Sequence, residues 1–385
     1  MEERKVSVFD ESKLESEFAL CGIKSLHVVT IFSYLLAHKE AEAHEVPDLP
    51  KAAYPLLRSK FKSTTSCVRA SQTSADGSTT KLLISLQNGQ TVEAVVMMHD
   101  ASTGIYAGGP RQGGPRATLC ISSQVGCQMG CTFCATGTMG LLGNVSAGEI
   151  VEQLVHATRI TPIRNVVFMG MGEPLNNYNA VVKAVKTMTG RFFSLSPSHI
   201  TISTVGVIPR MLSLAADLPG VNLALSLHAP TQELRCQIVP VARAYHLSKL
   251  MAALDSYISV SKRRVFVEYI MIGDINDTEE VAHRLGALLQ SRQVVVNLIP
   301  YNPTNTIANY KASQQESVRV FQKIIREVYN VRATVRREMG QDISGACGQL
   351  AIGNQEKATK QSLSFMNKPE PSDIEELCGV PAGGS

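Results

Sequence analysis

The sequence contains no tryptophan, and aromatic residues make up only 5% of its 385 residues. Scarce aromatics argue against a broad surface on which nucleic-acid bases stack. Long apolar runs are also missing: the most apolar early segment, 26–37, is interrupted by His27 and Ser33 and falls short of the ~20 residues that span a bilayer. The first five residues include acids, which targeting peptides avoid. We therefore expect a cytoplasmic protein with no membrane contact.

Charge of one sign is not in excess either, because 37 Lys and Arg residues face 33 Asp and Glu residues, for a net charge of +4. This balance is too even to identify a nucleic-acid partner. Hydrophobic residues make up 44% of the chain, which excludes a disordered or fibrous protein. Nine cysteines at uneven spacing do not form the pattern of a secreted disulfide framework. In a reducing compartment, closely spaced cysteines more often serve metal or redox chemistry.

The patterning divides the chain into four segments. Residues 1–58 are expected to form a helical N-terminal accessory region, because apolar residues recur at helical spacing within 26–35. Residues 59–115 hold strand-like runs at 81–86 and 91–96 around an Asn88-Gly89 turn, which predicts a β-hairpin. The glycine-rich stretch 104–115 lacks the flanking strand and helix of a phosphate-binding loop, so a flexible insertion is favoured. Residues 116–352 form the core, and 353–385 a flexible polar tail.

Strand-like and helix-like runs alternate through the core. The strand-like runs begin near residues 118, 165, 199, 222, 265 and 294, and helix-like runs follow at 146–159, 177–190, 208–217, 246–259, 277–291 and 314–329. Nearly continuous apolar strands that alternate with amphipathic helices predict a parallel sheet covered on both faces. The sequence therefore predicts an α/β fold, either a doubly wound sheet or an incomplete barrel.

Three cysteines, Cys127, Cys131 and Cys134, follow the first strand of the core within eight residues. Ligands collect at the carboxyl ends of strands in such folds. Three thiolates can hold three irons of a 4Fe–4S cluster and leave the fourth iron open for another ligand. Structural zinc is the alternative, but it normally needs four ligands. No nearby residue supplies the fourth, because Cys120 lies on the strand and His156 lies well along the next helix.

The Cys-x3-Cys-x2-Cys spacing resembles the radical S-adenosylmethionine (SAM) superfamily. Five motifs in order resemble, within it, the RlmN and Cfr family of RNA adenosine methyltransferases: RATLCISSQVGCQMGCTFCATG from Arg116, GMGEPLNN from Gly170, ALSLHAP from Ala224, NLIPYNP from Asn297 and DISGACGQL from Asp342. The resemblance runs from about residue 81 to 352. It implies a partial (βα)6 barrel, similar to an incomplete TIM barrel, that binds SAM and one 4Fe–4S cluster per chain.

The resemblance also assigns ligands. Cys127, Cys131 and Cys134 match the cluster ligands. By themselves, Gly172 and Glu173 would be interpreted as a tight turn and His228 as a buried core histidine, but His228 lies inside SLHAP at a strand end. The resemblance implies that SAM is contacted by Gly172, Glu173, Ser203, Ser226, Leu227, His228 and Asn302.

Two further cysteines and a carboxylate carry the reaction that the resemblance implies. Cys347 matches the cysteine that first accepts a methyl group from one SAM, and Cys120 matches the one that later frees the RNA and leaves a disulfide. Taken alone, each would be a buried structural thiol. Glu93 matches the proton acceptor, with an exposed strand residue as the alternative. The remaining cysteines match no motif and are expected to be incidental: Cys21, Cys67, Cys236 and Cys378.

The resemblance implies an RNA substrate, either rRNA or tRNA or both, and methylation of adenosine carbon-2 with two SAM molecules per turnover. It also implies an electron donor such as flavodoxin or ferredoxin, and we expect a monomer. A Cfr-like carbon-8 methyltransferase is the alternative enzyme, and a zinc-stabilised RNA-binding protein without catalysis is the alternative from another class. Candidate phosphate contacts, with a solvated surface as their alternative, are Lys262, Arg263, Arg264, Arg332, Arg336 and Arg337.

Overall fold

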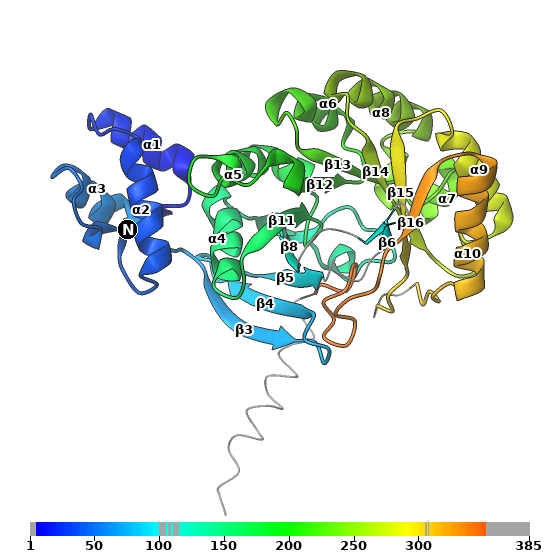
Figure 1. Ribbon diagram of the computed structural model, residues 1–385, viewed down its shortest axis with the longest axis horizontal. Coiled ribbons are helices and arrows are strands. Elements are labelled where there is room, and N and C mark those ends of the chain that lie inside the picture. The colour runs from blue at the N-terminus through cyan, green and yellow to red at the C-terminus, as the bar shows by residue number, and fades with distance from the viewer. Residues whose placement is uncertain are drawn as a thin grey trace, which may run out of the picture. The chain divides into compact units, whose positions relative to one another are not determined.

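A computed structural model describes residues 5–351, except 100–104, 107–108, 111–114, 305 and 307. Most of the glycine-rich stretch and the whole 353–385 tail therefore lie outside the described residues. The main sheet has ten strands (Figure 1). In spatial order these are β16 (Arg332–Val335), β15 (Val294–Pro300), β14 (Val265–Met271), β13 (Asn222–Ser226), β12 (Ile200–Thr204), β11 (Ile163–Phe168), β8 (Arg116–Cys120), β5 (Thr91–His99), β4 (Thr79–Ser85) and β3 (Cys67–Thr73).

Strands β8 and β11 to β16 run parallel to one another. Their apolar sequences suit a parallel sheet, whose strands are buried on both faces. Val267 of β14 pairs with Val296 of β15, and both side chains are fully buried. Strands buried on both faces need covering helices, which the connections between parallel strands supply. Figure 1 shows these helices around the parallel part of the sheet. They are α4 (Ala147–Thr158), α5 (Tyr178–Thr189), α6 (Ile208–Asp217), α7 (Gln232–Ile238), α8 (Leu247–Ser261), α9 (Glu279–Leu289) and α10 (Gln315–Lys323).

The six predicted strand–helix units are confirmed, and the two ends of the sheet, β16 and β3, are not paired with each other in the described part of the chain. The sheet is therefore open, as an incomplete barrel requires. Helix α7 was not predicted, because seven residues are too short for a helical period to stand out. None of the described helices is both long and apolar enough to cross a membrane.

The predicted hairpin is confirmed, but it belongs to the main sheet. The turn at Asn88-Gly89 joins β4 to β5, with Gly89 at φ 83°, and β5 pairs antiparallel with β8. This pairing places Val95 opposite Cys120. Strand β3, which was not predicted, extends the edge; its side chains are mostly exposed, so no apolar pattern marks it. Within the glycine-rich stretch, β6 (Ile105–Tyr106) and β7 (Gly109–Pro110) form one short antiparallel pair.

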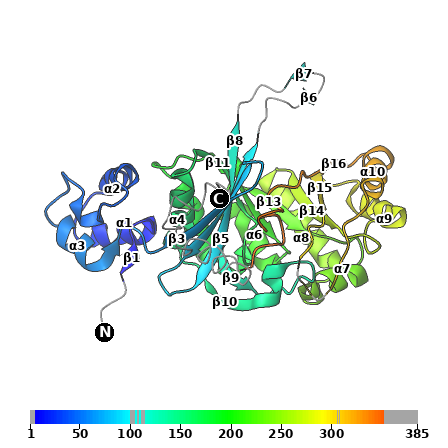
Figure 2. The ribbon, with the colours of Figure 1, turned by 90° about the horizontal axis from the view of Figure 1, so that it is seen from below.

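The N-terminal region is helical as predicted, and it packs on the core beside α4 (Figure 2) and α5 (Figure 1). Phe32 anchors it, because its ring centroid lies 4.9 Å from Phe9 and 5.6 Å from Phe192 of the core. Gly148 allows the N-terminal segment around Ser7 to approach α4 closely, since a Cβ at position 148 would lie 2.5 Å from the Ser7 side chain. The elements are β1 (Val6–Ser7), α1 (Glu11–Leu20), α2 (Leu26–Ala37), α3 (Ala53–Lys60) and β2 (Phe61–Lys62).

Glu152 of α4 fastens the connection between the N-terminal region and β3. Its buried carboxylate accepts hydrogen bonds from the backbone N–H groups of Thr65 and Ser66, both at 2.8 Å. The hydroxyls of the same two residues also donate to it, and Ser66 Oγ lies 3.0 Å from His156 Nε2. One buried carboxylate thus satisfies two backbone donors that would otherwise be unpaired.

Replacing Glu152 with Ala should lower the free energy of unfolding by about 3 kcal/mol, because two backbone N–H groups lose their acceptor. Urea denaturation measures this change. Glu316→Ala is the matched control, since Glu316 is exposed on α10, and it should change stability by less than about 0.5 kcal/mol. Equal effects of the two substitutions would contradict the role assigned to Glu152.

Candidate functional site

Two adjoining cavities lie at the carboxyl ends of the parallel strands. The first, of about 160 Å³, is lined by Cys120 and Cys347, and we call it the paired-cysteine cavity. The second, of about 120 Å³, is lined by Cys127, Cys131 and Cys134, and we call it the three-cysteine cavity. Cys347 therefore stands between the two cavities. The residues that line both are Met169, Ile299, Arg336, Cys347 and Gly348.

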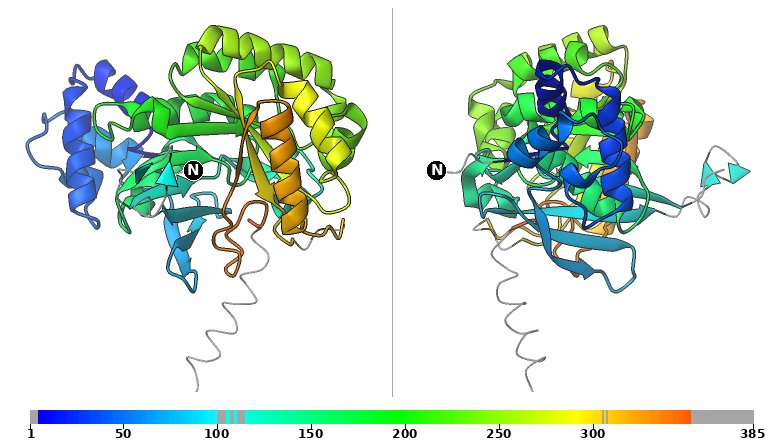
Figure 3. Two further views of the ribbon diagram at one scale, coloured as in Figure 1. Left: turned by 45° about the vertical axis from the view of Figure 1, so that its right-hand side comes forward. Right: turned by 90° about the vertical axis from the view of Figure 1, so that its left-hand side faces the viewer.

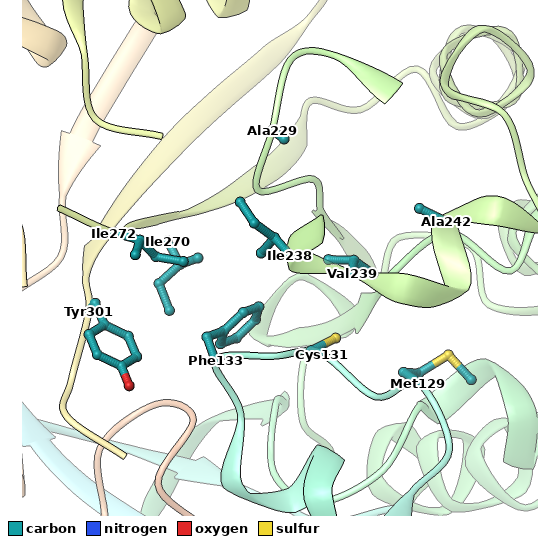
Figure 4. Packing of buried hydrophobic residues seen from close by; sticks show 10 residues of the cluster. All are labelled: Met129, Cys131, Phe133, Ala229, Ile238, Val239, Ala242, Ile270, Ile272 and Tyr301. Carbon is teal, nitrogen blue, oxygen red and sulfur yellow. The ribbon is translucent and has the colours of Figure 1, made fainter. Parts of the chain in front are cut away.

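The loop that carries the three cysteines is held in place by its backbone. It begins as β9 (Gln124–Cys127) ends, and the Cys134 N–H donates to the Cys131 carbonyl at 3.1 Å. The Thr132 N–H donates to the Ile238 carbonyl of α7 at 3.0 Å. In Figure 4, Met129, Cys131 and Phe133 lie beside apolar residues of other segments. These partners are Ala229, Ile238, Val239, Ala242, Ile270, Ile272 and Tyr301.

Burial raises the pKa of each of the three thiols, that of Cys127 to about 12. The thiols of Cys127 and Cys134 each raise the pKa of Cys131, so the three sulfurs lie close enough to influence one another's ionisation. Among the described residues, no three His, Cys, Asp or Glu side chains are placed to hold one metal ion. A 4Fe–4S cluster takes one thiolate per iron, so three cysteines of one loop can hold three of its irons.

Gly172 and Glu173 follow β11 and line the three-cysteine cavity. Gly172 has φ 99°, and a Cβ there would lie 2.5 Å from the Gln124 side chain, so only glycine fits. Glu173 accepts hydrogen bonds from the N–H groups of Val205 and Leu175, both at 3.0 Å. Burial raises the pKa of the Glu173 carboxyl to about 7. The pair is a tight turn and also part of the cavity wall.

Ser203, Ser226 and His228 line the same cavity. The two serine hydroxyls lie 3.1 Å apart. His228 Nδ1 accepts the Ile270 N–H at 3.1 Å, which leaves Nε2 to carry the ring proton. Burial lowers the pKa of His228 to about 3, so its imidazole is neutral. His228 is therefore a buried histidine, with one ring nitrogen hydrogen-bonded, that also faces a cavity.

Leu227 and Asn302 lie differently from their neighbours in the predicted SAM set. The Leu227 side chain is fully buried and does not line the three-cysteine cavity, and the Leu227 N–H donates to the Glu268 carbonyl at 3.1 Å. Asn302 lines the paired-cysteine cavity, and its Nδ2 donates to the Cys347 carbonyl at 3.2 Å. The Asn302 Oδ1 atom is buried without a hydrogen-bond partner.

Glu268, in the middle of β14, is a site residue that the sequence reasoning missed. It lines the three-cysteine cavity, where its Oε1 accepts a hydrogen bond from Asn297 at 2.9 Å and its Oε2 has no partner. Burial raises its pKa, and the Arg336 guanidinium opposes that rise. A carboxylate inside the otherwise apolar run VFVEYIMI was the signal that could have identified it.

Cys120 and Cys347 come from opposite parts of the chain. Cys120 ends β8, whereas Cys347 follows β16 in a loop tied to the three-cysteine loop by the Ala135 N–H, which donates to the Gly348 carbonyl at 2.8 Å. Burial raises the pKa of both thiols, that of Cys120 to about 12, and Arg336 opposes the rise at both. The eight cysteines that the structure describes are all free, so no disulfide joins this pair here.

Glu93 is not an exposed strand residue, so that alternative was wrong. Its side chain is fully buried, and Lys81 Nζ lies 3.3 Å from its Oε1. Lys81 also donates to the Ser344 carbonyl at 3.3 Å, in the loop that carries Cys347. Glu93 shares a face of β5 with Val95 and Met97, which line the paired-cysteine cavity, but it does not line the cavity itself.

The remaining residues of the sequence prediction are scattered. Cys21 and Cys67 are exposed, and Cys378 lies outside the described residues. The basic residues do not form one group: Arg336 and Arg337 line the paired-cysteine cavity, whereas Lys262 and Arg264 are exposed before β14, at the opposite end of the strands. Cys236 is partly buried on α7, where its sulfur accepts a hydrogen bond from Gln232.

Comparison with known proteins agrees with this geometry. The family model of the radical SAM superfamily matches residues 121–285. The "Ribosomal RNA large subunit methyltransferase N" of Nitrosopumilus maritimus is 40% identical over 321 residues, which are 80% of this chain and 87% of that protein. The "Dual-specificity RNA methyltransferase RlmN 1" of Myxococcus xanthus is 43% identical over 298 residues, or 75% of this chain and 78% of that protein.

A solved structure is similar over nearly the whole fold. The crystal structure of a radical SAM methyltransferase from Sphaerobacter thermophilus has a TM-score of 0.79 and 36% sequence identity, and the match covers 90% of this chain and 99% of that one. This chain belongs to the RlmN family of radical SAM methyltransferases.

Proposed function

We propose that this chain methylates carbon-2 of an adenosine in RNA and that the methyl group travels on the sulfur of Cys347. The observation that carries the proposal is the position of Cys347, which lines both the three-cysteine and the paired-cysteine cavity. A group bound in one cavity can therefore act on Cys347, and Cys347 can act on a base in the other. The relatives are named as RNA methyltransferases, one acting on ribosomal RNA and one with dual specificity, which supports RNA as the substrate class.

The residues present fit a 4Fe–4S cluster and SAM. Cys127, Cys131 and Cys134 would hold the cluster, and the buried Glu268 Oε2 without a partner marks room for a ligand's hydrogen-bond donor. When bound, the two groups together supply an adenosyl radical that can remove a hydrogen atom. The SAM contacts would come from Gly172, Glu173, Ser203, Ser226 and His228 of the three-cysteine cavity, with Asn302 in the adjoining paired-cysteine cavity.

The two thiols of the paired-cysteine cavity perform the covalent steps. Carbon-2 of adenine has no acidic proton, so a methyl group parked on Cys347 has to reach the ring as a carbon radical. After the carbon radical adds to carbon-2, the adduct loses the ring proton and one electron, which the oxidised cluster would accept. The Cys120 thiolate then attacks the sulfur of Cys347: a sulfur–sulfur bond forms, the bond from that sulfur to the transferred carbon breaks, and the electron pair left on the carbon takes up a proton to complete the methyl group. Two electrons from a donor of the flavodoxin or ferredoxin class, together with two protons, return the disulfide to two thiols. Arg336 favours both thiolates by opposing the rise in pKa that burial causes.

Glu93 is our candidate for accepting the ring proton of carbon-2. Its carboxylate lies on the cavity face of β5, next to Val95 in the register of that face. Burial raises the Glu93 pKa, and the Lys81 ammonium opposes that rise. A nearby cation favours the ionised carboxylate, which is the form that can accept a proton.

Anaerobic reconstitution with iron and sulfide should give about four iron and four sulfide per chain, because three thiolates and an open iron complete one cluster. Metal and acid-labile sulfide analysis measures this content. Substituting Ser for Cys131 should abolish it, whereas Cys67→Ser, at an exposed cysteine, should not. One tightly bound zinc per chain, with no cluster and no SAM cleavage, would instead support the zinc-stabilised RNA-binding protein.

Cys347→Ala should reduce RNA methylation by at least about 10³-fold, because the covalent carrier of the methyl group is lost. The same variant should still cleave SAM reductively, since the three cluster cysteines are unchanged. Chromatography of 5′-deoxyadenosine and mass spectrometry of digested RNA separate the two activities. Retained methylation in this variant would refute the role of Cys347.

The product should be 2-methyladenosine, in rRNA, tRNA or both. Mass spectrometry against synthetic standards distinguishes it from 8-methyladenosine, which is the product expected of a Cfr-like enzyme. Mapping the modified adenosines in RNA from cells with and without the gene identifies the substrate. Exclusive formation of 8-methyladenosine would overturn the assignment of carbon-2.

A further inference from the structure

The largest side chain that the structure buries almost completely is a cation, Arg235 of α7, with 1% exposure. Its guanidinium joins two strand ends, because Nη2 donates to the Val205 carbonyl at 2.6 Å and Nε donates to the Leu227 carbonyl at 3.2 Å. Val205 follows β12 and Leu227 follows β13. Both hydrogen-bond acceptors are neutral, so they satisfy the donors without balancing the charge.

Within the described residues, no carboxylate lies within 4.0 Å of the Arg235 guanidinium. The backbone of Val205 lies between Glu173 and Arg235, because its N–H donates to Glu173 and its carbonyl accepts from Arg235. His228 offers no compensation either, because its imidazole is neutral. Burial lowers the pKa of Arg235 only to about 10, so the side chain stays charged at neutral pH. A buried charge without a counter-charge is costly, which points to a partner with negative charge.

The three-cysteine loop lies directly beside this cation. Arg235 is one turn before Ile238, whose carbonyl accepts the N–H of Thr132, the residue after Cys131. Figure 4 shows Cys131 and Met129 next to Ile238 and Val239. Arg235 and Met129 also line a separate cavity of about 210 Å³, and Arg235 does not line the three-cysteine cavity. Arg235 therefore lies beside the three-cysteine loop without lining the three-cysteine cavity itself.

We propose that Arg235 is a positioning residue that supplies the buried counter-charge of the cluster and favours its reduced state by acting through Cys131. This inference rests on the proposed binding of a cluster by the three cysteines, but not on the RNA substrate or on the thiol pair.

The physical reason is the charge of the group that the cysteines would hold. Three thiolates give the bound cluster a net negative charge, and one electron from an external donor increases it, with no bond made or broken. A fixed cation nearby stabilises the state with the extra electron more than the state without it, and a poorly solvated interior strengthens the effect. The charge and solvent exposure around a cluster set its reduction potential.

Three variants of the reconstituted full chain test the proposal. Arg235→Gln removes the charge and keeps hydrogen-bond donors, Arg235→Lys keeps the charge with a different donor geometry, and Arg243→Gln removes a charge from the exposed segment that follows α7. Iron and sulfide analysis first establishes the cluster content of the unaltered chain and of each variant. Anaerobic dithionite titration with redox dyes, followed by electron paramagnetic resonance, then measures the ratio of reduced to oxidised cluster at a fixed potential.

The proposal predicts that Arg235→Gln lowers this ratio at least tenfold, equivalent to about 59 mV for a one-electron couple. In Arg235→Lys, the ratio of reduced to oxidised cluster should lie within about threefold of its value in the unaltered chain. Arg243→Gln should leave the ratio unchanged. Loss of the cluster in Arg235→Gln but not in Arg235→Lys would also support a counter-charge. An unchanged ratio in Arg235→Gln, or equal loss of the cluster in both Arg235 variants, would overturn it. Failure of the unaltered chain to bind a cluster would instead contradict the proposed function.

Discussion

The site depends on hydrogen bonds between two loops that lie far apart in the sequence. The Ala135 N–H donates to the Gly348 carbonyl at 2.8 Å, and Thr136 Oγ1 donates to the Leu350 carbonyl at 2.6 Å. These bonds join the three-cysteine loop to the loop that holds Cys347. The second loop is also fastened to the antiparallel part of the sheet, where Lys81 donates to the Ser344 carbonyl and the Ala75 N–H donates to the Asp342 side chain. In Figure 3 this loop, in orange, lies beside the blue strands of that part of the sheet. The position of Cys347 is therefore set by both halves of the sheet together.

Buried charge is the second constraint on the site. Burial raises the pKa of the thiols and of the carboxyls of Glu173 and Glu268, and three cations are distributed among them. Arg336 acts on the paired thiols and Glu268, Lys81 acts on Glu93, and Arg235 acts on Cys131. Each of these groups loses its hydration on folding, so burying them lowers the free energy of unfolding. The apolar parallel strands and the helices that cover them have to compensate for this cost.

The sequence was sufficient to predict the strand–helix units, the hairpin and the three-cysteine loop, because each depends on local patterns. Apolar runs and turn residues mark the elements, and parallel strands bring their carboxyl ends together. The direction in which a single side chain points was harder to predict. Leu227 turns its side chain into the core, Asn302 lines the paired-cysteine cavity, and Glu93 of β5 pairs with Lys81 of the neighbouring strand β4. These outcomes depend on register and on contacts between distant segments, which no local pattern encodes. Glu268 was missed for a different reason, since a single acid in an apolar run does not alter the strand pattern.

Because the two cavities share a wall, a chemical change at that wall affects what both cavities can bind. Cys347 forms part of that wall with Met169, Ile299, Arg336 and Gly348. Any atom added to the Cys347 sulfur occupies space in one of the two cavities. Closely packed interiors respond to changes as small as one methyl group. The covalent state of the Cys347 sulfur therefore affects the shape of both cavities at once. The molecules that one cavity can bind thus depend on the reaction that has already taken place in the other.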